Sequence, residues 1–324
     1  MKAIVRYRYG SPDVLELREI EKPVPKDQDV LVRVRAASLN ADDLEYLYGK
    51  SPFTRMATGL RQPRIHGLGV DVAGQVEAVG KQVTSFQEGD EVFGNMTVYG
   101  LGAYAEYVCA PARAFALKPA RMSFEEAATV PQSAILALQG LRGKRQIDSG
   151  DQVLINGAGG NVGPFAVQIA KYFGAEATGV DSTGKLDMVR SVGADHVIDY
   201  TREDVIGNGQ RYDLILDVVA RRSMWEWRRA LKPAGAYVML GASTALLLQG
   251  AFVGPLISLT GSRKLAVMWW WKPFQRNDVA FLKELIEAGR VAPVIDRRYP
   301  LNEVPDALRY LETGNARGKI VITV

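Results

Sequence analysis

A strand, a glycine-rich loop and a helix follow one another in residues 151–171, which read Asp-Gln-Val-Leu-Ile-Asn-Gly-Ala-Gly-Gly-Asn-Val-Gly-Pro-Phe-Ala-Val-Gln-Ile-Ala-Lys. Glycines allow a tight turn and a close approach of the backbone to a ligand, and the helix N-terminus offers free N–H groups to an anion. This order is typical of a βαβ unit that binds a dinucleotide pyrophosphate. A glycine-rich turn without a ligand is the alternative, which the two flanking elements disfavour. The residues predicted to contact the pyrophosphate are Gly157, Gly159, Gly160, Asn161, Val162 and Gly163.

The residues that would contact the adenosine ribose leave two interpretations open. Asp181 ends the next predicted strand, and an acid at that place usually binds the ribose hydroxyls of NAD. Hydroxyl groups and an ammonium nearby are suited instead to the 2′-phosphate of NADPH. We expect NADPH, with NADH as the alternative, and helix capping is an equally weighted role for Ser182 and Thr183. The residues predicted at this site are Asp181, Ser182, Thr183, Lys185 and Tyr200.

Strands and helices alternate after Ser123, which forms a predicted capping box with Glu126. Alternation of this kind predicts an α/β domain with a doubly wound parallel sheet, the Rossmann architecture. The expected strands are residues 151–156, 177–180, 196–200, 212–218 and 236–240. The expected helices are residues 162–173, 185–192, a segment around Trp225 and a segment after Asp278.

The first 120 residues have a different pattern, in which predicted strands outnumber helices. Residues 30–36, 70–80 and 88–94 have strand-like patterns and are punctuated by turns, while prolines and glycines interrupt any long helix. This is the composition of a small, irregular, β-rich barrel. The last stretch adds a predicted helix at residues 304–312 and a closing strand at residues 319–324.

Composition excludes several classes of protein. The 324 residues are 47% hydrophobic and 23% charged, which fits about two soluble globular domains. A net charge of +4 does not indicate nucleic-acid binding. One cysteine excludes an intrachain disulfide, and one cysteine with two histidines makes an ordinary zinc site very hard to build.

Targeting signals are few. The start, MKAIVRYRYG, lacks the apolar core of a signal peptide, so we expect a cytoplasmic protein. Residues 233–262 carry no charge and are long enough to span a bilayer. Glycines and a proline interrupt this stretch, so we expect a buried strand, a loop and a short helix there and no membrane span.

Several separate motifs resemble the medium-chain dehydrogenase/reductase family, and within it the zinc-free quinone oxidoreductase branch. The resemblance covers nearly the whole chain, although Asn161 stands where the branch usually has a glycine. It implies a discontinuous GroES-like catalytic domain, residues 1–122 and 267–324, around a Rossmann domain, residues 123–266. The motifs are Val76-Glu-Ala-Val-Gly, Phe86-Gln-Glu-Gly-Asp-Glu-Val, the loop with Gln168 and Lys171, residues 186–200, and Arg317-Gly-Lys-Ile-Val.

The resemblance also shows which metal ligands are missing. Zinc-dependent members would have a catalytic cysteine where this chain has Asn40, and a Gly-His-Glu run where it has Gly69-Val70-Asp71. Their structural zinc needs four cysteines between about residues 90 and 113, where only Cys109 occurs. We therefore expect no zinc. Because the metal acts as the Lewis acid for alcohol oxidation, its loss favours a conjugated enone or quinone, which accepts hydride more readily.

In this branch an Asn-x-x-Asp segment faces the nicotinamide, and Asn40-Ala-Asp-Asp43 matches it. The resemblance implies that Asn40 donates to the substrate oxygen and that Asp43 orients its neighbours, although Asn40 as a loop-capping amide is the alternative. Tyr46 is a candidate proton donor, with packing at least as plausible. Ser133 is expected to substitute for a threonine that the branch has at a nearby position, and His66 is a candidate for the cleft.

Further coenzyme contacts are expected from strand ends and from the last segment. Three consecutive tryptophans, 269–271, cannot all be buried in a strand, so we expect Trp270 in the substrate cleft, with a subunit interface as the alternative. We also expect a homodimer. The remaining predicted coenzyme contacts are Val218, Gly241, Ala242, Ser243, Met268, Trp270 and Lys319.

Together these expectations predict one function and leave two alternatives open. We expect a zinc-independent NAD(P)H-dependent reductase that transfers hydride to a small lipophilic quinone or α,β-unsaturated carbonyl compound. A biosynthetic reductase or alcohol dehydrogenase-like enzyme for one lipophilic metabolite is an alternative. A non-catalytic nucleotide- or RNA-binding relative is the rival from another class, disfavoured because the sequence lacks an aromatic and basic stacking platform.

Overall fold

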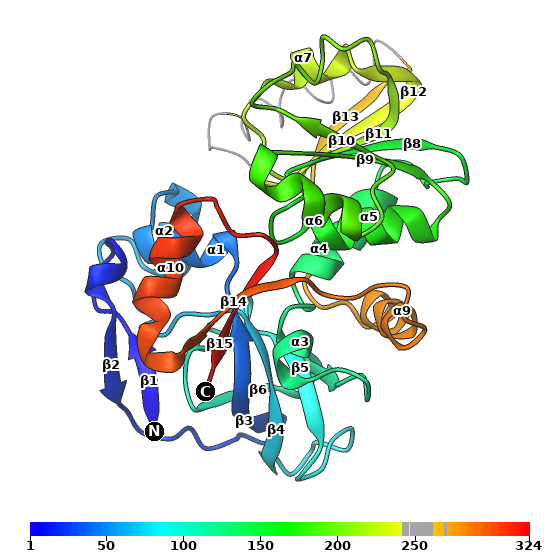
Figure 1. Cartoon of the computed structure of the whole chain (residues 1–324). Helices are drawn as coiled ribbons and strands as arrows, with labels where there is room; N and C mark the ends of the chain where they lie inside the picture. The colour runs from blue at the N-terminus through cyan, green and yellow to red at the C-terminus, as the bar shows by residue number, and fades with distance from the viewer. Residues whose placement is uncertain (242–245, 247–261, 269–270) are drawn as a thin grey trace. The chain divides into compact units, whose positions relative to one another are not determined.

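The computed structural model describes residues 1–241, 246, 262–268 and 271–324. The chain divides into two compact units, each made from separate stretches (Figure 1). The barrel unit comprises Met1–Ser133, Pro273–Glu287 and Pro293–Val324. The nucleotide unit comprises Ala134–Lys272 and Ala288–Ala292.

The described strands of the nucleotide unit form a six-stranded parallel sheet in the order β10-β9-β8-β11-β12-β13. The sheet starts in its middle and is wound in both directions, and it is thus the doubly wound Rossmann sheet predicted from the sequence. Its strands are β8 (Gln152–Asn156), β9 (Glu176–Asp181), β10 (His196–Asp199), β11 (Tyr212–Asp217), β12 (Leu231–Met239) and β13 (Lys264–Val267). Its helices are α4 (Ser133–Arg142, whose first residue belongs to the barrel unit), α5 (Gly163–Tyr172), α6 (Leu186–Ser191) and α7 (Met224–Arg228), with a 3-10 turn η3 (Thr183–Lys185).

Apolar runs explain why these strands are central. Val153, Leu154 and Ile155 of β8 are all fully buried, as expected for a parallel strand covered on both faces. The ring of Trp227 on α7 stacks on the ring of Tyr237 on β12, with centroids 6.2 Å apart, inside the core of this unit. The sheet therefore gives the glycine loop after β8 a rigid support.

The barrel unit is built on a seven-stranded sheet in the order β14-β15-β3-β4-β5-β7, with β6 paired to β3, and on a two-stranded β1-β2 sheet. Its strands are β1 (Lys2–Val5), β2 (Glu16–Glu19), β3 (Asp29–Ser38), β4 (Asp71–Val79), β5 (Glu91–Asn95), β6 (Tyr107–Pro111), β7 (Phe115–Leu117), β14 (Ile295–Pro300) and β15 (Lys319–Thr323). Its helices are α1 (Ala41–Tyr48), α2 (Pro52–Thr58), α3 (Phe124–Ala128), α9 (Arg276–Glu287) and α10 (Val304–Glu312). Its 3-10 turns are η1 (Pro12–Val14), η2 (Ala112–Ala114) and η4 (Leu301–Glu303).

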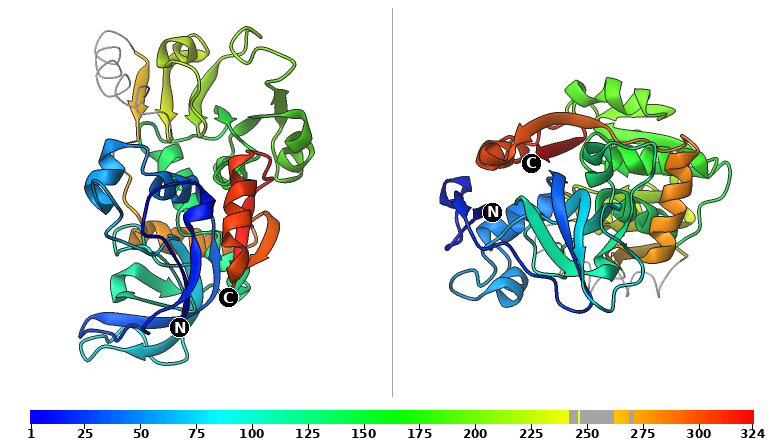
Figure 2. Two further views of the ribbon diagram at one scale, coloured as in Figure 1. Left: turned by 90° about the vertical axis from the view of Figure 1, so that its left-hand side faces the viewer. Right: turned by 90° about the horizontal axis from the view of Figure 1, so that it is seen from below.

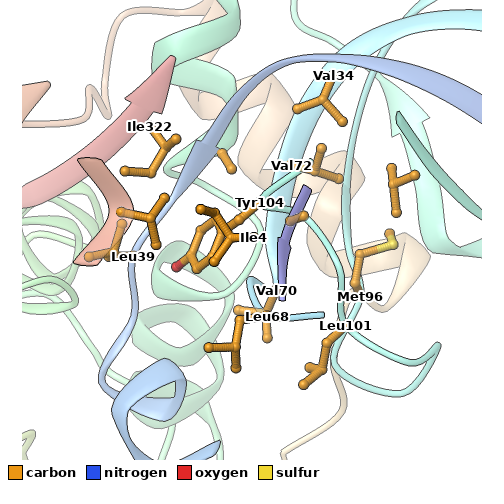
Figure 3. Close-up of a cluster of buried hydrophobic side chains, with 14 of the residues drawn as sticks. Ile4, Val34, Leu39, Leu68, Val70, Val72, Met96, Leu101, Tyr104 and Ile322 are labelled. Atoms are coloured by element: carbon orange, nitrogen blue, oxygen red, sulfur yellow. The ribbon is translucent and has the colours of Figure 1, made fainter. Parts of the chain in front are cut away.

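The core of the barrel unit collects side chains from both ends of the chain (Figure 3). The ring of Tyr104 lies among aliphatic side chains that include Ile4 and Leu39, and Ile322 of β15 contributes to the same core. All four side chains are at most 1% exposed. Both termini lie in this unit in every view (Figures 1 and 2), and Arg309 of α10 forms an ion pair with Asp13 of η1.

Most elements expected from the sequence are present. The capping box of Ser123 and Glu126 begins α3, and the predicted helix at residues 304–312 is α10. The predicted strand at residues 236–240 begins earlier, because β12 starts at Leu231. No helix among the described residues is long and apolar enough to cross a membrane. Most of the predicted loop and short helix within residues 233–262 lies outside the described residues.

Candidate functional site

Three neighbouring strands of the barrel unit bring polar side chains together. Strand β3 lies between β4 and β15, and Ser38 at its end pairs with Asp71 of β4 and with Val321 of β15. Asn40 precedes α1 directly after this strand, while Lys319 is the first residue of β15. We refer to Asn40, Asp71, Ser133 and Lys319 as the polar cluster.

Lys319 is the cation of the polar cluster and is only 1% exposed. Its ammonium donates to Asn40 Oδ1 at 2.7 Å, to the carbonyl oxygen of Leu39 at 3.0 Å and to Ser133 Oγ at 3.1 Å. Asp71 Oδ2 lies 3.7 Å from the same nitrogen. Burial lowers the pKa of Lys319, and the carboxylate of Asp71 opposes that shift. Because an ammonium has three donor hydrogens, its hydrogen-bonding capacity is fully used.

Asp71 is the anion of the polar cluster and is fully buried. Its Oδ2 accepts from Asn40 Nδ2 at 2.9 Å and from the backbone N–H of Gln132 at 3.3 Å. Its Oδ1 accepts from Asn95 Nδ2 at 2.8 Å. Burial raises the pKa of Asp71, while Lys319 and these donors act to lower it. The carboxylate is thus held from β4, β5, the start of α1 and the start of α4.

Asp43 lies one helical turn into α1 and closes the start of that helix. Its Oδ2 accepts the backbone N–H of Asn40 at 2.8 Å. Burial raises the pKa of Asp43 to about 7, with the nearby carboxylates of Asp71 and Asp42 adding to the shift. Asp43 therefore holds the backbone N–H of Asn40, and it keeps a proton more firmly than an exposed aspartate does. Its predicted role in the reaction stays a prediction.

Tyr46 lies one turn further along α1. Its side chain is half-buried, and its carbonyl oxygen accepts from the buried guanidinium of Arg6. Burial, followed by the carboxylates of Asp42 and Asp43, raises the pKa of the Tyr46 hydroxyl. A phenol whose pKa is raised is a weaker acid, so this environment disfavours Tyr46 as a proton donor.

Ser133 and His66 have distinct environments. Ser133 begins α4, is fully buried, and places its Oγ 3.3 Å from Asn40 Oδ1, so it belongs to the polar cluster. His66 is exposed, with its Nδ1 3.0 Å from the carbonyl oxygen of Arg6 and its ring 4.8 Å from that of Tyr7. Its predicted role toward the substrate stays a prediction.

The glycine loop of the nucleotide unit has the predicted local structure. Gly157 has a φ of +86°, which favours glycine, and its N–H donates to the carbonyl oxygen of Val180 in β9 at 2.9 Å. A side-chain carbon on Gly160 would meet only Gly157 O, at 3.6 Å, so this turn leaves open space above the backbone. Val162 precedes α5, which begins at Gly163. The loop therefore fits a diphosphate that needs close approach to the backbone and a helix N-terminus.

Asp181 is bound to the glycine loop. Its Oδ2 accepts the backbone N–H of Gly159 at 2.8 Å, and its Oδ1 accepts that of Ser182 at 2.8 Å. Lys185 Nζ lies 3.8 Å from Oδ1. One carboxylate oxygen thus binds the glycine loop and the other binds the residue after β9, and the ammonium offsets part of the negative charge that would repel a 2′-phosphate.

The other residues predicted near the ribose lie around the ends of β9 and β10. Thr183 donates its hydroxyl to Asp199, whose pKa is lowered by this bond and by the Thr201 hydroxyl. The side chain of Tyr200 is 48% exposed, so it is accessible to a ligand. Ser182, Thr183 and Lys185 come directly after β9, which ends at Asp181. Their contact with the ribose stays a prediction.

The remaining predicted coenzyme contacts are only partly described. Val218 follows β11 and donates its N–H to the carbonyl oxygen of Asn156 at 3.0 Å, while Gly241 accepts from the N–H of Ala220 at 3.2 Å. Met268 follows β13 and is 7% exposed. Both glycine-loop and strand-end positions therefore cluster at the carboxyl ends of parallel strands. Ala242, Ser243 and Trp270 lie outside the described residues.

The structure adds residues that sequence reasoning did not select. Asp71 was noted only as a metal-ligand position of relatives, and the structure places it at the centre of the polar cluster. Asn95 and Gln132 were not selected at all, because no motif marks an amide or a backbone N–H that contacts a residue far away in sequence. The hydrogen bonds of Lys319 with Asn40 and Ser133 differ from its predicted contact with the coenzyme.

Comparisons with known proteins agree with this architecture. An alcohol dehydrogenase GroES-like domain model matches residues 26–120, and a zinc-binding dehydrogenase model matches residues 192–322. The chain is 35% identical to the 2-methylene-furan-3-one reductase of Solanum lycopersicum, over 99% of this chain and 79% of the relative. The chain belongs to the medium-chain dehydrogenase/reductase family. Within this family it is quinone oxidoreductase-like.

Two further relatives support this place in the medium-chain dehydrogenase/reductase family. The NADPH-dependent alkenal/one oxidoreductase of Arabidopsis thaliana is 34% identical, over 99% of this chain and 79% of the relative. The structure of the quinone oxidoreductase from Coxiella burnetii superimposes with a TM-score of 0.90 at 30% identity, covering 100% of this chain and 99% of that one.

The resemblance implies that two residues of the polar cluster, Asn40 and Asp71, stand where zinc-dependent members have catalytic metal ligands. The chain has Asn40, Val70 and Asp71 at those positions, and Val70 is fully buried in the apolar core. The ammonium of Lys319 already lies against both Asn40 and Asp71. Zinc prefers thiolate, imidazole and carboxylate ligands. Asp71 is the one such group in the polar cluster, and an ammonium lies beside it, so this donor set does not fit zinc. Nor do any three His, Cys, Asp or Glu side chains in the described part of the chain form a metal-binding group.

Proposed function

We propose that this protein is an NADPH-dependent, zinc-independent reductase of quinones and α,β-unsaturated carbonyl compounds. The proposal is supported by relatives that are named as a quinone oxidoreductase, an alkenal/one oxidoreductase and a 2-methylene-furan-3-one reductase. The observation that carries it is the polar cluster, in which an ammonium and an amide replace a metal site.

The chemistry of the cluster favours reduction of a conjugated carbonyl. Oxidation of a simple alcohol needs a group that lowers the hydroxyl pKa, and the cluster offers neither a metal ligand set nor an uncommitted base. A conjugated carbonyl takes hydride at carbon, and its oxygen then carries the negative charge. Asn40 offers an N–H to that oxygen, so the residue suits stabilisation of a developing oxyanion.

The residues of the candidate site then have the following proposed roles. The loop from Gly157 to Gly163 binds the diphosphate of the coenzyme, which supplies the hydride when bound. Asn40 binds the substrate oxygen, and Asp43 fixes the backbone of Asn40. Because burial and neighbouring carboxylates keep the proton on Tyr46, solvent is the proposed source of the proton that completes the reduction.

The preference for NADPH is proposed from the ribose site and from the named coenzyme of the Arabidopsis relative. Lys185 offers a positive charge, and Ser182 and Thr183 flank it with hydroxyl groups. Both oxygens of Asp181 accept backbone N–H groups, one from Gly159 in the loop and one from Ser182, and these bonds offset part of its negative charge. A small lipophilic carbonyl compound as substrate and a homodimeric assembly complete the proposal.

A substrate panel tests the function. The purified protein, dialysed against a chelator, is assayed with NADPH against quinones, enones, saturated ketones and saturated alcohols. We expect turnover of quinones or enones that added zinc does not increase. Turnover of saturated alcohols that depends on zinc, with none of enones or quinones, would contradict the proposal. Light scattering of the same sample tests the homodimer.

A further inference from the structure

We propose that Lys319 and Asp71 are positioning residues for the reaction, because together they hold the side-chain amide of Asn40 in one orientation. In that orientation Asn40 presents an N–H to the substrate oxygen, and its own oxygen stays bound to Lys319. This inference rests on the proposed reductase function and names two residues through which the site is assembled.

The hydrogen bonds determine which amide atom faces which partner. An ammonium only donates, so the atom 2.7 Å from Lys319 Nζ must be the amide oxygen of Asn40. The Asp71 carboxylate accepts the hydrogen bond, so the atom 2.9 Å from its Oδ2 must be the amide nitrogen. Turning the amide by 180° would place oxygen against a carboxylate and N–H against an ammonium. The two charges therefore exclude the flipped amide.

The bound orientation leaves Asn40 a donor. Its nitrogen carries two hydrogens, and one of them goes to Asp71. Among the described residues this nitrogen has the one hydrogen bond to Asp71, and Asn40 is 3% exposed. The second hydrogen is the one that the proposal assigns to the substrate oxygen. Donation from a cation to the amide oxygen also polarises the amide and strengthens its N–H as a donor.

Lys319 acts through Asn40 and not on the substrate. Its three hydrogens go to Asn40, Leu39 and Ser133, so none remains for a ligand. Asp71 is equally committed, because Asn95 and the backbone of Gln132 bind its oxygens. Both charges are at most 1% exposed, and water therefore does not screen them from the amide.

The experiment is a double-mutant cycle between Asn40 and the charge pair. Removing one charge leaves the other buried and unpaired, so the informative variant changes both, Lys319→Met with Asp71→Asn. The second arm is Asn40→Ala, and the third combines all three substitutions. Kinetic constants are measured with NADPH and one good enone or quinone substrate, beside the unfolding temperature and NADPH affinity of each variant.

We expect Asn40→Ala to lower kcat by roughly 100-fold, the range for loss of one oxyanion donor. The charge-pair variant is expected to lower kcat by a similar factor, with NADPH affinity within about twofold of wild type, since the glycine loop is untouched. Adding Asn40→Ala to the charge-pair variant should then lower kcat by no more than about threefold, because the donor has already lost its orientation.

A purely structural role gives a different result. The inference is overturned if the fold-loss of kcat in the triple variant equals the product of the losses in Asn40→Ala and in the charge-pair variant. It is also overturned if the charge-pair variant keeps wild-type kcat. Lys118→Met is the matched control, since Lys118 has a side chain only 5% exposed and pairs with Glu91 at 3.0 Å outside the polar cluster. It should keep kcat. A wild-type protein with no reductase activity would instead overturn the proposed function.

Discussion

The carboxyl group of Asp43 makes the stability of the protein depend on pH. Its pKa is raised to about 7 by burial, so the native state keeps a proton that the unfolded state loses near pH 4. The contribution of Asp43 to stability is therefore greatest below about pH 4 and falls as the pH rises to about 7.

Asp43→Asn should remove this dependence, because an amide does not ionise and its oxygen can still accept from the N–H of Asn40. Relative to wild type, the variant should gain up to about 4 kcal/mol of unfolding free energy between pH 4 and pH 7. Urea denaturation of both proteins across this range measures the gain. Parallel curves of unfolding free energy against pH would contradict the assignment.

The ribose site gives a second prediction for single residues. Lys185→Ala should raise the KM for NADPH by about tenfold and leave that for NADH nearly unchanged, because only the 2′-phosphate needs the ammonium. Asp181→Ala should weaken both coenzymes, since the N–H of Gly159 loses its acceptor. Titrations with both coenzymes measure this. If neither variant changes coenzyme preference, the ribose site lies elsewhere.

Individual site residues could be predicted from the sequence only where they belong to a recognisable motif. Asn40 and Asp43 were selected because their spacing matches a family pattern, and the structure places both around the start of α1. Lys319 was selected for a contact with the coenzyme, yet its ammonium binds a residue 279 positions earlier in the chain. No local pattern encodes such a contact. The pairing of β15 with β3 has to be known first.

At the scale of an element, the loop between β8 and α5 contains glycines with two different roles. A side-chain carbon on Gly163 would lie 2.4 Å from the backbone of Ala158, whereas one on Gly160 would meet nothing closer than 3.6 Å. Gly163 is therefore needed for folding of the turn. Gly160 is needed only if a ligand approaches there.

Gly163→Ala should lower the unfolding free energy by about 1–3 kcal/mol through steric crowding. Gly160→Ala should change it by less than about 0.5 kcal/mol but weaken NADPH binding, because the added methyl occupies the open turn. Thermal unfolding and fluorescence titration of the two variants provide the comparison. Wild-type NADPH affinity in Gly160→Ala would show that the diphosphate does not contact this part of the loop.

Elements with a strong period or a capping signal were predictable from the sequence. The strand before the glycine loop, the helix after it and α10 follow from apolar periodicity, and α3 follows from its capping box. Short edge elements such as β2 and β14 were not predicted. All residues of β2 are exposed and none of β14 is buried, so pairing with β1 and β15, not apolar periodicity, defines them.

At the scale of the whole molecule, each unit has its own apolar core. Ile322 lies in the core of the barrel unit, while Trp227 and Tyr237 lie in that of the nucleotide unit. The sequence indicated a discontinuous barrel domain through the family resemblance, since the β-rich texture of the first 120 residues does not itself reveal that residues 319–324 join them.

Ile322→Ala should test this separation, because Ile322 is fully buried. The substitution should cost about 2–5 kcal/mol of unfolding free energy in the barrel unit. Hydrogen exchange should increase in β3, β4 and β15, while NADPH affinity stays within about twofold of wild type. If β8 and β9 lose as much protection from hydrogen exchange and NADPH binding weakens, the two units unfold cooperatively and the prediction is wrong.

The position of Lys319 in the chain has a consequence for synthesis. Asn40 and Asp71 leave the ribosome well before Lys319, and at 5–20 residues per second the interval is roughly 15–60 seconds. During that time β3 lacks its neighbour β15, and the amide of Asn40 has no cation beside it. The complete sequence of the glycine loop emerges within this interval. On the role proposed for Lys319, a nascent chain would form its glycine loop before the amide of Asn40 is oriented, and a chain that stops before residue 319 would lack that orientation.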